Sequence, residues 1–300
     1  MAEGGTQILC TTHRRDELIP AITRVMELKG GRVHEMHDLF AEVQRSGGKV
    51  EGKRQKAKWK SLKSDALRTA QPFQIDICNA SVALDEGTKV VLQDVTWRMN
   101  LGEHWMMVGD NGVGKSILLK LLLGELWPSA GGSIERFGRS DFNNIWEIKK
   151  QIGFVSADFQ TRYFVDLTAE KVIASGFFAS IGWLQPTTRA QDKRVREVIA
   201  QLGLQDLAQR SILQMSYGQA RKVLVARALV NKPRLLILDE VFDGLDTQFR
   251  AELSALFDGL AAQGTGVILV SHHEADILGC ITHRMKIEDG RIVQQEERLR

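Results

Sequence analysis

Cysteine, proline and tyrosine are scarce in this sequence: its 300 residues include three Cys, five Pro and two Tyr. The cysteines (Cys10, Cys78 and Cys280) are odd in number, far apart and without a Cys-x-x-Cys pair. This spacing argues against a disulfide framework and against a structural zinc site. It is typical of a protein of the reducing cytosol, which is where we expect this one to act.

Long apolar runs and a strong net charge are also missing. No stretch approaches the roughly 18 uncharged apolar residues of a membrane span, and residues 1–5 lack the basic-then-apolar order of a signal peptide. The net charge of +3 gives by itself no reason to expect nucleic acid as a partner. With 43% hydrophobic and 26% charged residues, the composition is that of a globular protein with no membrane span of its own.

A glycine-rich stretch has the phosphate-binding pattern Gly, four residues, Gly-Lys-Ser. It consists of Gly109, Asp110, Asn111, Gly112, Val113, Gly114, Lys115 and Ser116. An apolar strand at 103–108 precedes it and a helix from Ile117 follows, the context in which such a loop presents N–H groups to phosphate. An unrelated turn would match by chance in about one chain in a hundred. We predict nucleotide binding by this loop and Ile117, with Lys115 at the β- and γ-phosphates and Ser116 on Mg²⁺.

Two carboxylates follow an almost wholly apolar run at 234–238, which is typical of a parallel strand buried on both faces. In a P-loop protein we expect Asp239 to hold Mg²⁺ and Glu240 to act as general base toward the attacking water. The alternative is a strand that happens to end in an acidic turn. The upstream P-loop argues against that alternative.

The apolar pattern alternates between strands and helices. It predicts strands at 73–77, 90–97, 152–156, 234–238 and 267–270, and helical segments at 168–203 and 216–230. This alternation favours a doubly wound α/β core with the P-loop at its switch point.

Three more motifs follow in a fixed order: Met215-Ser216-Tyr217-Gly218-Gln219, Gly244-Leu245-Asp246 and Ser271-His272. With the P-loop and the acidic pair, this set resembles the nucleotide-binding cassettes of ABC ATPases over roughly residues 71–293. The resemblance implies an α/β fold: a P-loop NTPase core with a mostly parallel sheet, an antiparallel β subdomain and a helical signature subdomain.

The resemblance also implies how the site works. Its cofactors would be ATP and Mg²⁺, and the signature would meet the γ-phosphate held by an opposite cassette. Two cassettes must then face each other to hydrolyse ATP. Asp246 resembles the residue that couples the two sites. The signature residues are Ser216, Gly218 and Gln219, and the expected catalytic residues are Lys115, Glu240 and His272, the last resembling the switch histidine.

Closer resemblance is to the tandem-cassette, ModF-like ATPases associated with molybdenum transport. It is carried by Ser175-Gly176-Phe177-Phe178, Ser216-Tyr217-Gly218-Gln219, Ser271-His272-His273 and Cys280-Ile281-Thr282-His283-Arg284. It implies a membrane permease chain, for molybdate, as a candidate partner. The sequence departs from the usual cassette pattern at Leu84, Ala157, Tyr217 and Val241, which puts adenine selectivity and standard transporter coupling in question.

The first residues of the chain repeat the last ones. Residues 5–13 align with 264–272 without a gap, and the same offset places Gly31-Arg32 over Gly290-Arg291. A fixed offset over this length indicates an internal repeat. We expect residues 1–33 to be the C-terminal remnant of a first cassette, 34–70 a basic linker and 71–300 a complete cassette. The second cassette of the working pair would be this missing copy or another molecule of the chain.

Eight basic side chains lie between residues 49 and 68, with few acidic ones. Such a run is usually a solvated linker. Its functional alternative is a tandem ABC protein that binds ribosomes or nucleic acid, which we disfavour because the linker is short for the charged arm of those proteins. A regulatory cassette without hydrolysis is a further alternative, supported by Leu84 and Ala157 but opposed by Glu240 and His272.

Overall fold

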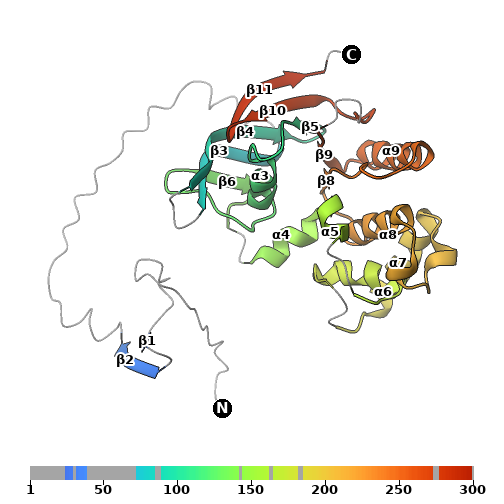
Figure 1. The fold of residues 1–300 in the computed structure, drawn as a ribbon, viewed down its shortest axis with the longest axis horizontal. Coiled ribbons are helices and arrows are strands. Elements are labelled where there is room, and N and C mark those ends of the chain that lie inside the picture. The colour runs from blue at the N-terminus through green and yellow to red at the C-terminus, as the bar shows by residue number, and fades with distance from the viewer. Residues whose placement is uncertain are drawn as a thin grey trace. The chain divides into compact units, whose positions relative to one another are not determined.

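The computed structural model describes residues 24–29, 32–38, 72–84, 89–141, 144–161, 165–181, 185–272 and 277–298, the first two ranges by their backbone only. The chain divides into two compact units, residues 1–61 and 62–300 (Figure 1). The larger unit contains the predicted P-loop and every predicted site residue.

A six-stranded sheet forms the centre of the larger unit, in the order β11-β10-β5-β9-β8-β7. All neighbouring strands are parallel except β10 and β11. The strands are β5 (His104–Val108), β7 (Ile152–Ser156), β8 (Leu235–Asp239), β9 (Gly266–Val270), β10 (His283–Glu288) and β11 (Arg291–Glu297). The mostly parallel sheet confirms the predicted fold class.

Both faces of this sheet are covered, which explains why its central strands are mostly apolar. Leu235 and Ile237 of β8 pack into one core, and the alternate residues Leu236 and Leu238 pack into another. Side chains alternate between the two faces of a strand, so neither face of β8 can be polar.

The first core is closed by a three-stranded antiparallel sheet, in the order β4-β3-β6, and by helix α3 (Lys115–Leu122). Its strands are β3 (Phe73–Leu84), β4 (Lys89–Asn100) and β6 (Ser133–Arg136). This sheet is the antiparallel β subdomain that the resemblance implied. Trp97 of β4 packs edge-on against Trp105 of β5 and joins the two sheets.

The second core lies under the helices. They are α6 (Ala169–Ser175), α7 (Arg189–Gln201), α8 (Tyr217–Leu229) and α9 (Thr247–Ala262), with the short turns η2 (Gly176–Phe178), η3 (Gln205–Leu207) and η4 (Ile212–Gln214). Figure 1 shows α6, α7 and α8 gathered together, away from the antiparallel sheet. Two short helices, α4 (Ile145–Gln151) and α5 (Ala157–Thr161), flank β7.

The prediction of a helical segment over 168–203 was wrong in its middle. Helix α6 ends at Ser175, and α7 begins only after Thr188. Gly176 lies so close to the Arg227 carbonyl that any side chain there would collide with it. Thr188 and Gln191 then form a capping box, which starts a new helix by satisfying its first N–H groups.

The smaller unit contains a described hairpin of β1 (Arg24–Lys29) and β2 (Arg32–Asp38). Its first residue pairs with its last, and a bulge interrupts the register between Glu27 and Leu28. The basic run between residues 49 and 68 and the aligned segment 5–13 lie outside the described residues.

Candidate active site

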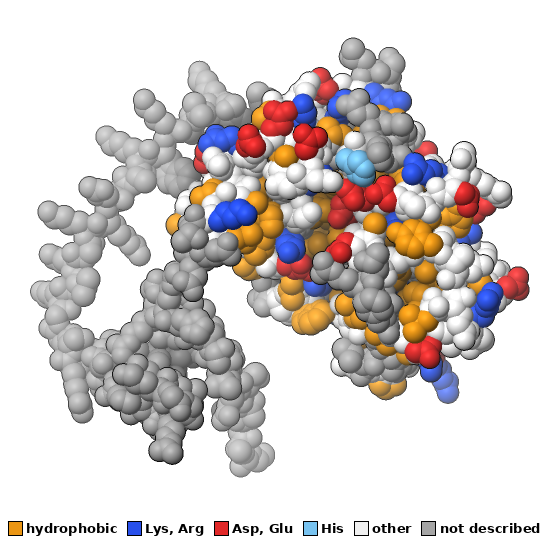
Figure 2. Space-filling view, viewed as in Figure 1, with side chains coloured by type: hydrophobic (Ala, Val, Ile, Leu, Met, Phe, Trp, Pro, Cys, Tyr) orange, Lys and Arg blue, Asp and Glu red, His pale blue; other side chains and the backbone are white. Residues whose placement is uncertain are grey.

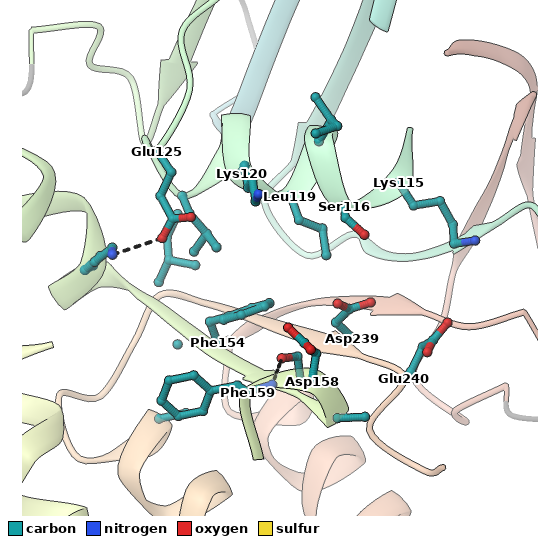
Figure 3. A pocket seen from close by; sticks show the side chains of 18 of the residues that line it. Lys115, Ser116, Leu119, Lys120, Glu125, Phe154, Asp158, Phe159, Asp239 and Glu240 are labelled. Carbon is teal, nitrogen blue, oxygen red and sulfur yellow. Dashed lines mark hydrogen bonds and ion pairs between the residues drawn. The ribbon is translucent and has the colours of Figure 1, made fainter. Parts of the chain in front are cut away.

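A cavity of about 910 Å³ opens at the carboxyl ends of β7 and β8, against the P-loop (Figure 3). The cavity wall includes predicted site residues from two segments of the chain that are far apart in sequence. They are Asn111, Gly112, Gly114, Lys115, Ser116 and Ile117 of the P-loop and α3, together with Asp239 and Glu240 at the end of β8. Gly109, Asp110 and Val113 complete the loop between β5 and α3.

Glycine is required in this loop because of how tightly it bends. Gly114 has φ of 108° and immediately precedes α3. A Cβ placed on it would meet Leu92 Cδ2 at 3.0 Å and the Val91 carbonyl at 3.1 Å. Helix α3 begins without a side-chain cap, which leaves N–H groups of its first turn available to an anion. The loop therefore fits an anion such as a nucleotide phosphate.

Lys115 is largely buried, with 7% of its surface exposed. Its Nζ donates to the carbonyl oxygens of Gly109 at 2.6 Å and Asp110 at 2.8 Å. An ammonium group has three donors, so one remains for a phosphate oxygen. Lys115 thus holds the loop in shape and supplies positive charge at its base.

Ser116 and Asp239 lie on opposite walls of the cavity (Figure 3). Burial and the neighbouring Glu240 carboxylate raise the pKa of Asp239 to about 6, against the opposing effect of Lys115. A half-buried carboxylate that lacks a closely bonded cation favours binding one. Hydroxyl and carboxylate oxygens are the ligands that Mg²⁺ prefers, so this pair fits the predicted metal.

Glu240 and His272 are in contact at the edge of the cavity. His272 Nδ1 lies 3.3 Å from Glu240 Oε1, and about a third of each side chain is exposed. Asp243 brings a third possible ligand atom, and the three ligand atoms lie within 4.8 Å of one another. Figure 2 shows acidic side chains gathered beside a histidine on this face. The pair is placed where a water molecule could be oriented above a bound phosphate.

Asp158 is a cavity residue that sequence reasoning missed. It lies in the first turn of α5, directly after β7, and points into the cavity (Figure 3). Its charge also contributes to the raised pKa of Asp239. The signal was available, because the residues that follow neighbouring parallel strands meet at one edge of the sheet.

One of the noted departures, Ala157, lines this cavity. The resemblance to ABC cassettes implies a glutamine at this position. Gln160, one turn later, does not compensate: its Nε2 donates to the Tyr217 carbonyl at 2.8 Å and its Oε1 accepts from Arg221. The side chain of Gln160 is therefore engaged with the signature helix.

The signature residues are not part of the cavity wall. Ser216 is the N-cap of α8, and its side chain accepts from the Gln219 N–H while the Gln219 side chain accepts from the Ser216 N–H. Gly218 lies in the first turn. Ser216 is exposed, and so is the N-terminus of α8 that it caps. Within one chain the structure thus separates the signature from the P-loop.

Asp246 lies at the start of α9, where its side chain accepts from the Phe249 N–H at 2.8 Å. Gly244, two residues before it, has φ of 72°, and a Cβ there would lie 2.9 Å from the Tyr217 ring. The segment after Glu240 therefore packs against the signature of the same chain.

These features define the protein as a nucleotide-binding protein of the P-loop class, with the carboxylates Asp239 and Glu240 at the end of β8. Residues 92–243 match the ABC transporter family. The chain belongs to that family, as an ATP-binding cassette of the ATPase type, which confirms the resemblance drawn from the motifs.

Curated relatives agree. The chain is 41% identical to the ABC transporter ATP-binding protein ModF of Escherichia coli over 75% of its length, but it spans only 46% of ModF. It is 32% identical to the uncharacterized ABC transporter ATP-binding protein YmeB of Lactococcus lactis, covering 71% of this chain and 83% of that protein.

Solved structures show the same fold. One is cbiO1 of Clostridium perfringens, part of the transporter complex cbiONQ (TM-score 0.66, 23% identity, 76% of this chain and 89% of that one). Another is the dimeric cassette MJ0796 bound to ADP and phosphate (TM-score 0.62, 23% identity, 74% and 98%). Among the described residues, no helix is both long enough and apolar enough to cross a membrane.

Proposed function

We propose that this chain binds Mg-ATP, closes face to face with a second cassette, hydrolyses the ATP and passes the motion to a transporter. The observation that carries the proposal is the separation of the signature from the cavity beside the P-loop of the same chain. P-loop residues, Asp239 and Glu240 line one cavity, and His272 contacts Glu240 at its edge, whereas the signature caps an exposed helix start outside the cavity. A nucleotide held by one chain can meet a signature only from a second cassette.

Each residue has a role that follows from its place. The P-loop N–H groups and Lys115 bind the phosphates, and Ser116 and Asp239 hold the metal. Bound Mg²⁺ neutralises charge on the phosphates. Glu240 orients a water and accepts its proton, and His272 holds the Glu240 carboxylate from the side at 3.3 Å.

A surface beside the cavity suits the transporter partner. Ile181 lines the cavity and is 52% exposed, and Trp146 of α4 is 49% exposed. Lys149 Nζ and Glu125 Oε1 form an ion pair at 3.0 Å, and both residues also line the cavity. Exposed large apolar side chains beside charged ones are typical of a protein contact. We infer a membrane permease chain as the partner and a cytosolic position for this one. The resemblance points to molybdate as the substrate.

The N-terminal hairpin supports the proposal that a first cassette precedes this one. In both hairpins, β1–β2 and β10–β11, the first residue pairs with the last. In both, the bulge follows the fourth residue of the first strand, Glu27 in β1 and Lys286 in β10. The two hairpins therefore share their strand register and the position of the bulge, in agreement with the sequence repeat. The linker boundaries stay a prediction.

The test is the solution mass of the Glu240→Gln variant with and without Mg-ATP. The substitution removes the base but keeps the size and hydrogen bonding of the side chain, so ATP should bind and stay intact. We expect a monomer that becomes a dimer on adding Mg-ATP. The matched control adds Ser216→Arg, which puts a bulky cation at the exposed start of α8 and should abolish the dimer without abolishing ATP binding.

The unmutated chain supplies the second measurement. Its hydrolysis rate per chain should rise with protein concentration if two chains form the working pair. ATP binding without a dimer would show that this chain does not pair with itself, and the first cassette would become the required partner. Absence of ATP binding would refute the proposed function.

A further inference from the structure

Arg221 on α8 is the most completely buried charged side chain near the active site, with no exposed surface. Its guanidinium donates to the Val241 carbonyl at 2.6 Å and to the Glu240 carbonyl at 3.4 Å. It also donates to the Tyr217 hydroxyl at 2.6 Å and to Gln160 Oε1. One side chain therefore joins the signature, helix α5 and the segment that carries the catalytic carboxylate.

Gln160 closes this network. Its Oε1 accepts from Arg221, while its Nε2 donates to the Tyr217 carbonyl. The guanidinium also lies over the Tyr217 ring, 5.1 Å from its centre. Tyr217 is thus held at its ring, its hydroxyl and its carbonyl, so a displacement of the signature must displace Arg221 or break several bonds at once.

The other end of the network holds Glu240 by its backbone. Glu240 has φ of 50°, a left-handed conformation that non-glycine residues adopt only when their surroundings impose it. Its N–H donates to the Val270 carbonyl, and its own carbonyl accepts from Arg221 and from the Asp243 N–H. The direction of the Glu240 carboxylate therefore depends on the position of Arg221.

A purely structural explanation covers only part of this arrangement. A buried arginine that satisfies two carbonyls would stabilise the turn at Glu240 without any help from the signature. Tyr217, however, is 40% exposed at the start of α8, on the surface that a second cassette must cover. An exposed tyrosine whose hydroxyl turns inward to that arginine connects the surface with the catalytic turn.

We propose that Arg221 is a positioning residue that couples the signature of a chain to Glu240 of the same chain, with Tyr217 as the contact that senses the opposing cassette. The inference rests on the proposed face-to-face pairing and adds a regulation of the same site. When the signature of a chain closes on the nucleotide held by the opposing cassette, Tyr217 takes up a fixed position. Arg221 then fixes the turn at Glu240, which acts on the nucleotide held by its own chain. Each site thus reports its occupancy to the other.

The first test separates positioning from folding. Tyr217→Phe removes only the hydroxyl, and Arg221→Lys keeps the charge but loses the planar fork of donors. Both should lower kcat about tenfold, the effect of one charged hydrogen bond, with the ATP dissociation constant changed less than about twofold. The matched control is Arg194→Lys, because Arg194 also holds two carbonyls, those of Leu229 and Val230, but away from the cavity. It should keep kcat.

The second test uses mixed pairs in which only one chain carries an intact Glu240. In the first pair, a Tyr217→Phe chain meets a Glu240→Gln chain, so the altered tyrosine and the working Glu240 share a chain. In the second pair, a chain with both substitutions meets an unmutated chain, so they are on opposite chains. We expect slow hydrolysis in the first pair and normal hydrolysis in the second.

The outcomes distinguish this inference from the pairing itself, which solution mass measures separately. Slow hydrolysis in the second pair would mean that Tyr217 acts on the opposite nucleotide and would overturn the inference. Equal rates in both pairs would overturn it as well, because no coupling within the chain would exist. If ATP binds but no pair of this chain forms, the premise of this inference fails and the inference with it, whereas the proposed function is refuted only if ATP does not bind.

Discussion

Replacing Asp239 by asparagine should stabilise the nucleotide-free protein while removing its metal site. The expectation follows from the raised pKa of Asp239, about 6 where an ordinary aspartate has 3.8. A higher pKa in the folded state means that folding disfavours the ionised carboxylate. Asparagine has the same shape and no charge, so it escapes that cost.

The magnitude follows from the two pKa values. The difference between 3.8 and about 6 corresponds to about 3 kcal/mol of unfolding free energy at neutral pH. Removing the carboxylate leaves Lys115 with its two carbonyl partners, Gly109 and Asp110, so the lysine is not left without hydrogen bonds. For a domain of this size the gain amounts to a rise in melting temperature of about 6 to 12 °C.

The pH dependence has a definite sign. Below the unfolded pKa of 3.8 the carboxyl group is protonated in both states, and Asp239 costs nothing. Between pH 3.8 and about 6 the unfolded chain ionises Asp239 while the folded protein keeps it protonated, so the folded protein loses stability relative to the variant until its own carboxyl group ionises. The advantage of Asp239→Asn should therefore be absent near pH 4, grow between pH 4 and 6, and be complete above pH 7.

Thermal and urea unfolding at pH 5 and 7.5, without nucleotide or metal, would measure this gain. The matched control is Asp158→Asn, which removes a carboxylate from the same cavity at an exposed position and should change stability much less. The Asp239→Asn variant should also lose Mg²⁺-dependent ATP binding. An Asp239→Asn protein no more stable than the parent at pH 7.5 would refute the argument that burial of this charge is costly.

Two further substitutions test the local structure. Gly114→Ala should abolish ATP binding and destabilise the fold by about 2 kcal/mol, because φ of 108° and contact with Leu92 oppose a Cβ. Isothermal titration would measure the loss of ATP binding and thermal melting the loss of stability. Unchanged ATP affinity would contradict the expectation. Asp246→Ala should cost about 1 kcal/mol of unfolding free energy through loss of the cap on the Phe249 N–H, whereas Asp246→Asn, which keeps an accepting oxygen, should cost clearly less.

The sequence predicted well wherever one local pattern decides the outcome. The strands β8 and β9 were identified because a parallel strand covered on both faces must be apolar throughout. The P-loop was identified because its glycines are needed for its backbone shape. The helical segment at 168–203 was mispredicted: after the turn η2 the chain leaves the helical conformation at Ala179, whose φ is 49°, and no local pattern marked that residue.

In the candidate site, too, local motifs were predicted and contacts between distant segments were not. Motif order assigned Lys115, Asp239 and Glu240 to one place, and the structure brings them around one cavity. Asp158 was missed because its place in the cavity depends on β7 pairing with β8, and that pairing was not used in the sequence analysis. Gln160 lies three residues after Ala157 in the sequence, but the hydrogen bonds of its side chain to Tyr217 and Arg221 engage it with α8.

The sequence by itself determined the class of protein, the P-loop and the two carboxylates that line its cavity, because these depend on residue types at fixed spacing. Only the tertiary structure decided how the parts are connected. It set the raised pKa of Asp239 through burial and neighbouring charge, the left-handed turn at Glu240, and the bonds of Arg221 to Tyr217 and Gln160. Such couplings arise between residues that the chain brings together only when its sheet and helices have packed.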